Sequence, residues 1–131
     1  MLLSRLLLGL AFTVLARAEN FNGKCELFAN GQSQGERDCR IETNTPSARG
    51  NCPGRLGVWV YYRYRGTDAY SVLFELDGDS FSGSCSQEGF DHSVNGTLGG
   101  GSINGSMTFQ YKKGPETGTT VEIRFAGSTR R

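Results

Sequence analysis

The sequence predicts a single small all-β domain, built as an antiparallel barrel or sandwich of about eight strands and stapled by disulfides. Three observations lead to this fold class. Apolar and polar residues alternate with a period of two, turn residues rich in glycine separate the alternating runs, and no helical apolar spacing persists beyond the first eighteen residues. A length of 131 residues suits one domain and leaves no room for two ordinary ones.

Residues 1–18 are typical of a secretory signal peptide. Arg5 precedes an apolar run over 6–16, and Ala16-Arg17-Ala18 fits the small-x-small rule for cleavage before Glu19. The run is shorter than the roughly 20 residues that span a bilayer. We therefore expect a single secreted domain over 19–131, with no membrane anchor, that is extracellular, or periplasmic if the source is bacterial.

The strand pattern runs through the rest of the chain. The clearest alternating segments are 58–65, 70–76, 102–111 and 120–125, and weaker ones are 24–29, 36–43, 80–87 and 90–98. Asp77-Gly78 is a two-residue hairpin signal, and the longest irregular stretch is 44–55. Because each run is apolar on one side, we expect antiparallel strands whose short connections favour sequential pairing, closed as a barrel or split into two sheets.

Four cysteines indicate two disulfides in a short exported chain. Four cysteines allow three pairings, and we favour Cys25–Cys39 with Cys52–Cys85 because the first two flank the turn-rich segment 30–35 at nearly equal distances and would lie face to face in a hairpin. Zinc is disfavoured because no CxxC spacing occurs. We expect no metal and no cofactor.

In architecture, a secreted eight-stranded barrel of this kind resembles the calycins, which include lipocalins and avidins. The residues that mark those families are absent here. No Gly-x-Trp follows the predicted leader, and the single tryptophan, Trp59, lies well inside the chain. The resemblance therefore concerns architecture, and it implies no ligand.

One strand carries aromatic residues on both of its sides. Val58, Val60, Tyr62 and Tyr64 alternate with a second set that consists of Trp59, Tyr61, Arg63 and Arg65. Exposed aromatics beside arginines can stack on sugar rings, contact a partner protein or hold an anion. The competing interpretation is that the loop 44–55 covers Trp59 and Tyr61, or that the strand lies between two sheets.

Other polar features support weaker hypotheses. Asn95-Gly-Thr97 and Asn104-Gly-Ser106 fit the N-glycosylation pattern, and both asparagines fall on polar faces. The acidic cluster 75–79 lacks the EF-hand spacing, so we expect it to be solvated. His92 is predicted to share the apolar side with Phe90 and Val94, away from its sequence neighbours Asp91 and Ser93.

The composition excludes some classes of function. Fourteen basic residues against thirteen acidic ones give a net charge of only +1, which is too small a basic excess for a nucleic-acid partner. We expect a non-catalytic binding module for a glycan or an extracellular protein, with Trp59, Tyr61, Arg63 and Arg65 as the ligand-binding candidates. One alternative is a secreted inhibitor of a foreign enzyme that presents 44–55. A small hydrolase centred on His92 is the other.

Overall fold

The computed structural model describes residues 19–44, 52, 54, 56–61 and 70–129, and it confirms the all-β prediction. In this part of the chain eight antiparallel strands form one closed barrel, each paired with the next and the last with the first. The strands are β1 (Glu19–Ala29), β2 (Gln32–Asn44), β3 (Leu56–Tyr61), β4 (Tyr70–Asp77), β5 (Ser80–Ser86), β6 (Phe90–Gly99), β7 (Ser102–Tyr111) and β8 (Thr120–Ser128). The predicted leader 1–18 lies outside the described residues.

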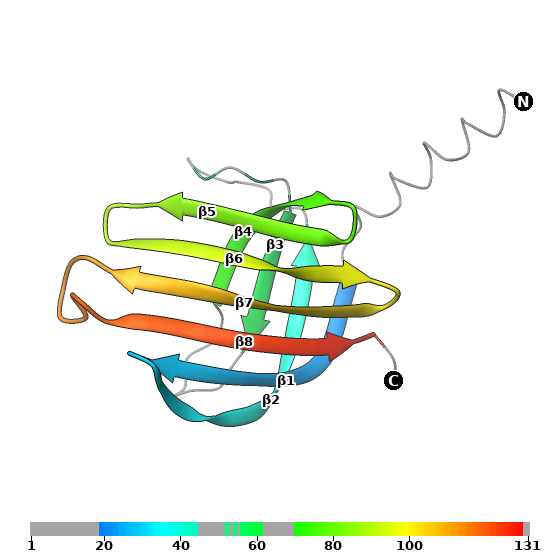
Figure 1. Cartoon of the computed structure of the whole chain (residues 1–131), viewed down its shortest axis with the longest axis horizontal. Helices are drawn as coiled ribbons and strands as arrows, with labels where there is room; N and C mark the ends of the chain where they lie inside the picture. Colours follow the sequence, from blue (N-terminus) through cyan, green and yellow to red (C-terminus); the bar gives the residue numbers. More distant parts are fainter. Residues whose placement is uncertain (1–18, 45–51, 53, 55, 62–69, 130–131) are drawn as a thin grey trace, which may run out of the picture.

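The barrel has two layers whose strands cross steeply (Figure 1). Strands β5, β6, β7 and β8 lie side by side in one layer, and β3 and β4 pass behind them. The long strands β1 and β2 bend and connect the two layers. The core therefore lies between the layers, and each layer keeps an outer face that is open to solvent.

The alternation predicted from the sequence places the core correctly. Inward positions on every strand are buried; they include Phe21, Leu27, Ile41, Val58, Val60, Phe74, Ile103, Met107 and Ile123. Each fully buried side chain of this size stabilises the fold by about 1.5–3 kcal/mol relative to its exposed state. Outward positions on the same strands are mostly polar, as a sheet covered on one face requires.

Two hairpin turns differ slightly from the predicted ones. The β1–β2 turn is only Asn30 and Gly31, with φ angles of 51° and 82°, which is the type I′ pattern that asparagine and glycine favour. The Asp77-Gly78 signal is displaced by one residue: Asp77 pairs with Ser80, so Gly78 and Asp79 form the loop. Gly78 takes the first central position because its φ of 66° suits glycine.

Both predicted disulfides form, but the first is diagonal rather than face to face. Cys25 pairs in register with Arg37, and Cys39 pairs with Gly23. The midpoint of the two cysteines is position 32, whereas the turn is centred between Asn30 and Gly31. With the register irregularity between Glu26 and Phe28, the two cysteines are offset by two residues. The offset is an even number of residues, so both side chains still point to the same side of the hairpin.

The second disulfide lies beside the shortest ladder among the described strands. β4 and β5 share three register pairs, from Glu75 with Ser82 to Asp77 with Ser80. Gly54, which precedes β3, lies against β4: an added Cβ there would be 2.8 Å from the backbone nitrogen of Phe74. Because Cys52 is bonded to Cys85 on β5, the disulfide ties this segment and β4 to β5.

Candidate functional site

The outer face of β2 and β3 holds the aromatic residues that the sequence singled out. Trp59 lies opposite Glu42 on β2 and Ser71 on β4, and it is half-buried. Its indole Nε1 donates a hydrogen bond to Oδ1 of Asn44 at 3.1 Å. The ring has room because its neighbour on the same face is Gly57: an added Cβ there would lie 3.3 Å from Nε1. The indole is thus held across the outside of the barrel.

Tyr61 continues this face and is fixed in the same way. Its hydroxyl donates to Oε1 of Glu42 at 3.3 Å, and the guanidinium of Arg40 lies 4.2 Å from the ring centroid. Arg40 also forms an ion pair with Glu42 at 3.1 Å. The result is a connected outer surface, which we call the Trp59 face, made of Arg40, Glu42, Asn44, Trp59 and Tyr61.

Only part of the Trp59 face could be predicted from the sequence. Trp59 and Tyr61 are brought together as predicted, whereas Arg63, Arg65 and most of the loop 44–55 lie outside the described residues. The three residues contributed by β2 were missed. Arg40 and Glu42 were only polar positions in the weakly alternating segment 36–43, and Asn44 was assigned to the irregular stretch 44–55, whereas β2 extends to Asn44. Nothing in the local sequence says that Arg40 pairs with Tyr61 or that Glu42 pairs with Trp59.

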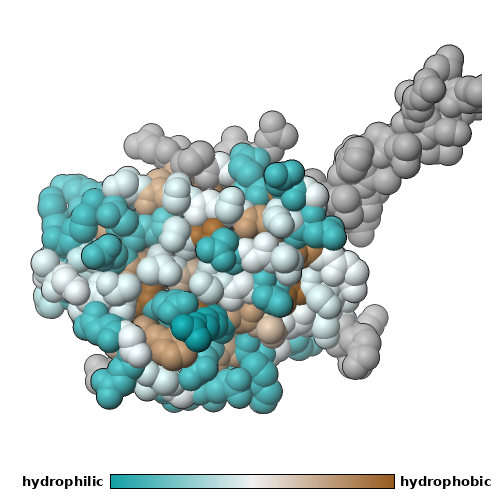
Figure 2. All heavy atoms as spheres, in the orientation of Figure 1, coloured by the Kyte–Doolittle hydropathy of each residue, from teal (hydrophilic) through white to brown (hydrophobic). Residues whose placement is uncertain are grey.

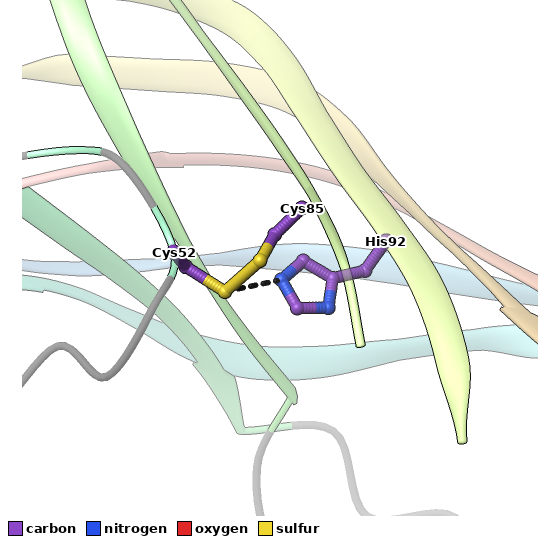
Figure 3. Close-up of side chains that lie close together, drawn as sticks. All are labelled: Cys52, Cys85 and His92. Atoms are coloured by element: carbon purple, nitrogen blue, oxygen red, sulfur yellow. Dashed lines mark hydrogen bonds between the residues drawn. A yellow bond between two sulfur atoms is a disulfide. The ribbon is translucent and has the colours of Figure 1, made fainter. Parts of the chain in front are cut away.

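His92 lies inside one end of the barrel, as predicted. It is 8% exposed, and its ring packs among aromatic side chains, 5.2 Å from Phe90 and 5.8 Å from Phe109 between ring centroids. Figure 3 shows its Nε2 beside the disulfide, 3.9 Å from Sγ of Cys52. A disulfide sulfur can only accept, so a hydrogen bond at this contact requires the tautomer with its proton on Nε2. Nδ1 is then a buried acceptor without a hydrogen-bond partner.

Cys52, Cys85 and His92 offer three possible metal-ligand atoms within 4.8 Å of one another. Metal binding requires thiolates, however, and these two sulfurs are bonded to each other. The donor set therefore does not fit a metal while the disulfide is intact. Among the described residues this is the only such group, and the acidic cluster 75–79 does not form one.

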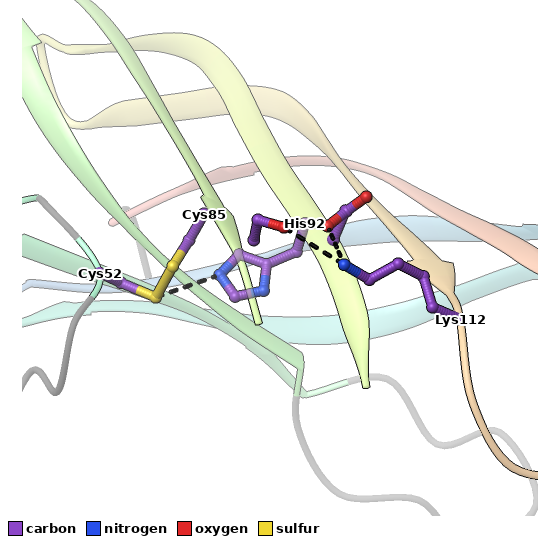
Figure 4. The surroundings of a disulfide bond; sticks show 6 residues. Cys52, Cys85, His92 and Lys112 are labelled. Carbon is purple, nitrogen blue, oxygen red and sulfur yellow. Dashed lines mark hydrogen bonds and ion pairs between the residues drawn. A yellow bond between two sulfur atoms is a disulfide. The ribbon is translucent and has the colours of Figure 1, made fainter. Parts of the chain in front are cut away.

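A second polar group lies on the opposite side of β6 from His92. Asp91 accepts hydrogen bonds from Ser86 at 2.5 Å and from Lys112 at 2.9 Å, and these contacts hold the pKa of its carboxyl below the usual value. Figure 4 shows Lys112 across the strand from the imidazole. Burial lowers the pKa of His92, a shift that the charge of Asp91 partly opposes. Within the described residues, no serine hydroxyl or carboxylate hydrogen bonds to His92.

The two predicted glycosylation sites face each other on the outer surface. Asn95 on β6 pairs with Ser106 on β7, and Asn104 pairs with Thr97, so each asparagine lies opposite the hydroxyl residue of the other sequon. Both asparagines are exposed. Their side chains are therefore open to modification in a host that glycosylates exported proteins.

No family model, no curated protein and no solved structure matches this chain. None of the described residues belongs to a helix long and apolar enough to cross a bilayer. The two disulfides are consistent with an oxidising, extracellular environment.

Proposed function

We propose that this chain is a secreted, non-catalytic recognition module that binds a glycan at the Trp59 face. The observation that carries the proposal is the arrangement of two half-buried aromatic rings, Trp59 and Tyr61, whose polar ends are already held by neighbours on β2. Sugar rings stack their apolar faces on aromatic side chains. Rings that are fixed before binding lose little conformational freedom when a ligand arrives.

The polar rim of the Trp59 face supports the same ligand class. Glu42 and Asn44 bring carboxylate and amide groups to the polar ends of the rings, and the guanidinium of Arg40 lies over one face of Tyr61. A few directional polar groups around an apolar platform suit a ligand that has hydroxyls at its edge and C–H groups on its face. The paired charges of Arg40 and Glu42 favour a neutral sugar over a charged one.

The test is calorimetric titration of the purified protein with soluble oligosaccharides, using chitopentaose, cellopentaose and xylopentaose as probes. We expect saturable binding of at least one of them. The single tryptophan gives a second readout, because a sugar stacked on Trp59 shifts its fluorescence. Trp59→Ala and Tyr61→Ala should each weaken the affinity at least tenfold, while thermal unfolding confirms that the variants are folded.

Phe28→Ala is the matched control. Phe28 is also a half-buried outer aromatic, and its ring lies under the guanidinium of Arg124 at 4.3 Å, but it is on β1. This variant should bind like the parent protein. Equal losses in all three variants, or no saturable binding of any probe, would overturn the proposal. If the chain instead forms a specific complex with another protein, and this complex requires Trp59, the ligand of the Trp59 face is a protein and the glycan proposal is wrong.

A further inference from the structure

The outer face of β5, β6 and β7 contains a shallow hollow of about 580 Å³. Its outward-facing lining residues are Ser84, Ser86, Asp91, Ser93, Thr108 and Gln110. The strand register aligns them in two rows, with Ser93 between Ser84 and Thr108 and with Asp91 between Ser86 and Gln110. Figure 2 shows this side of the molecule, where hydrophilic and neutral surface predominates. The volume is within the range of about 300–1,000 Å³ that ligand sites occupy.

The hollow carries no unbalanced charge among its described residues. Asp91 is neutralised by Lys112, and Ser86 completes the network by donating to Asp91 and accepting from Lys112 at 3.2 Å. An anionic or cationic ligand would therefore find its counter-charge already paired at this end of the hollow.

The remaining lining groups are available for hydrogen bonding. Within the described residues, the side chains of Ser84, Ser93, Thr108 and Gln110 make no hydrogen bond. Three hydroxyls and one amide offer both donors and acceptors on adjacent strands of a rigid sheet. This is the reverse of the Trp59 face, where the polar atoms of the rings are already paired. The complementary ligand is neutral and has several hydroxyl groups.

We propose that this hollow is a second binding site, for a neutral oligosaccharide, on the opposite side of the barrel from the Trp59 face. In a closed ring of eight strands, β6 lies four strands from β2, and Figure 1 shows β3 behind the β5–β8 layer. With a ligand at each face, the chain is bivalent and can join two glycan chains. This inference rests on the proposed function only in taking a glycan as the class of ligand. The residues of the hollow are argued independently of the Trp59 face.

The test is a two-dimensional ¹⁵N NMR titration with the same three pentasaccharides, on protein from a host without N-glycosylation. The Trp59 indole N–H reports on one face, and the amides of Ser84, Ser93 and Thr108 report on the other. We expect both groups of signals to shift with separate dissociation constants. Thr108→Val and Gln110→Ala should weaken the binding in the hollow at least fivefold and leave the Trp59 signal unaffected.

Thr97→Val is the matched control, because Thr97 is an exposed outer threonine of the same sheet that does not line the hollow. If Thr97→Val weakens binding as much as Thr108→Val, the inference is wrong. Shifts at Trp59 alone overturn the second site and leave the proposed function standing. Shifts in the hollow alone support the site in the hollow and overturn the proposed function at the Trp59 face. If neither group of signals shifts, both proposals are wrong.

Discussion

The two disulfides join parts of the sheet that are supported very differently. Cys25–Cys39 connects β1 and β2, which share ten register pairs, whereas Cys52–Cys85 lies beside the β4–β5 ladder of three. A cross-link within a long ladder adds to a hairpin that hydrogen bonds already hold. A cross-link beside a short ladder supplies a connection that the hydrogen bonds do not. We therefore expect the β4–β5 seam to depend locally on its disulfide.

Removing each disulfide in turn tests this difference and has the largest expected effect. For loops of 14 and 33 residues, the chain-entropy model gives losses of about 3 and 4 kcal/mol, which are similar in size. Urea unfolding of the Cys25→Ala/Cys39→Ala and Cys52→Ala/Cys85→Ala variants should show comparable decreases in the free energy of unfolding. Hydrogen exchange should separate them, because only the second variant is expected to lose amide protection along β4 and β5. Unchanged protection there would contradict the comparison.

A methyl group at Gly83 should weaken the same seam with both disulfides intact. An added Cβ would overlap the carbonyl oxygen of Leu73 and lie 2.9 Å from Cα of Phe74, so β4 and β5 would have to move apart. We expect Gly83→Ala to lower the free energy of unfolding by about 1–3 kcal/mol.

The control for this prediction is Gly89→Ala. Gly89 follows β5, and an added Cβ there meets nothing within 4 Å. The free energy of unfolding of this variant should therefore stay within about 0.5 kcal/mol of the value for the parent protein. Gly23→Ala sharpens the comparison further. The Cβ added at Gly23 would overlap the carbonyl oxygen of Ala126 on β8 in a similar way, but β1 and β8 share eight register pairs. A seam-specific loss of protection should follow from Gly83→Ala and not from Gly23→Ala.

Features that depend on local pattern could be predicted from the sequence. The inward position of His92 between Phe90 and Val94 follows from the period of two, and the cysteine pairing follows from the turn between Cys25 and Cys39. Both depend on residues that are close in the sequence.

Features that depend on strand partners could not be predicted. Cys52 lies 40 residues before His92, and Asn44 lies 15 residues before Trp59. The register of β2 against β3 brings Asn44 to Trp59, and the disulfide to Cys85, which pairs with His92, brings Cys52 to the imidazole. The hollow on β5–β7 was missed for the same reason, since a serine at Ser84 or Ser93 is an ordinary outer residue until the register aligns it with Thr108. Position across a sheet depends on long-range pairing, which a single sequence does not encode in any short window.

The stability of the whole fold should also respond to pH, through His92. Burial holds the pKa of its imidazole below the ordinary 6.5, so the unfolded chain takes up the proton first as the pH falls. The contribution of the neutral ring to stability is then complete above about pH 6.5 and is lost as the pH falls through the folded-state pKa. Urea unfolding at pH 8 and pH 5 should show this decrease. His92→Phe, which suits the neighbouring rings, should remove this part of the dependence, and an identical pH profile in the variant would show that another group is responsible.

The smallest expected effects come from two outer-surface ion pairs, one on the β1–β2 ladder and one between β6 and the end of β7. Lys24 and Asp38 lie 2.6 Å apart on the long β1–β2 ladder, but their side chains are 63% and 86% exposed. Water and salt screen such a pair, so Lys24→Ala should leave the unfolding midpoint unchanged at physiological ionic strength. Lys112 is less exposed and contacts both Asp91 and Ser86, so Lys112→Ala should produce a small decrease that shrinks as salt is added. If Lys24→Ala lowers the unfolding midpoint more than Lys112→Ala does, the β1–β2 ladder depends on its surface charges. That result would contradict the view that hydrogen bonds between the two strands hold this ladder.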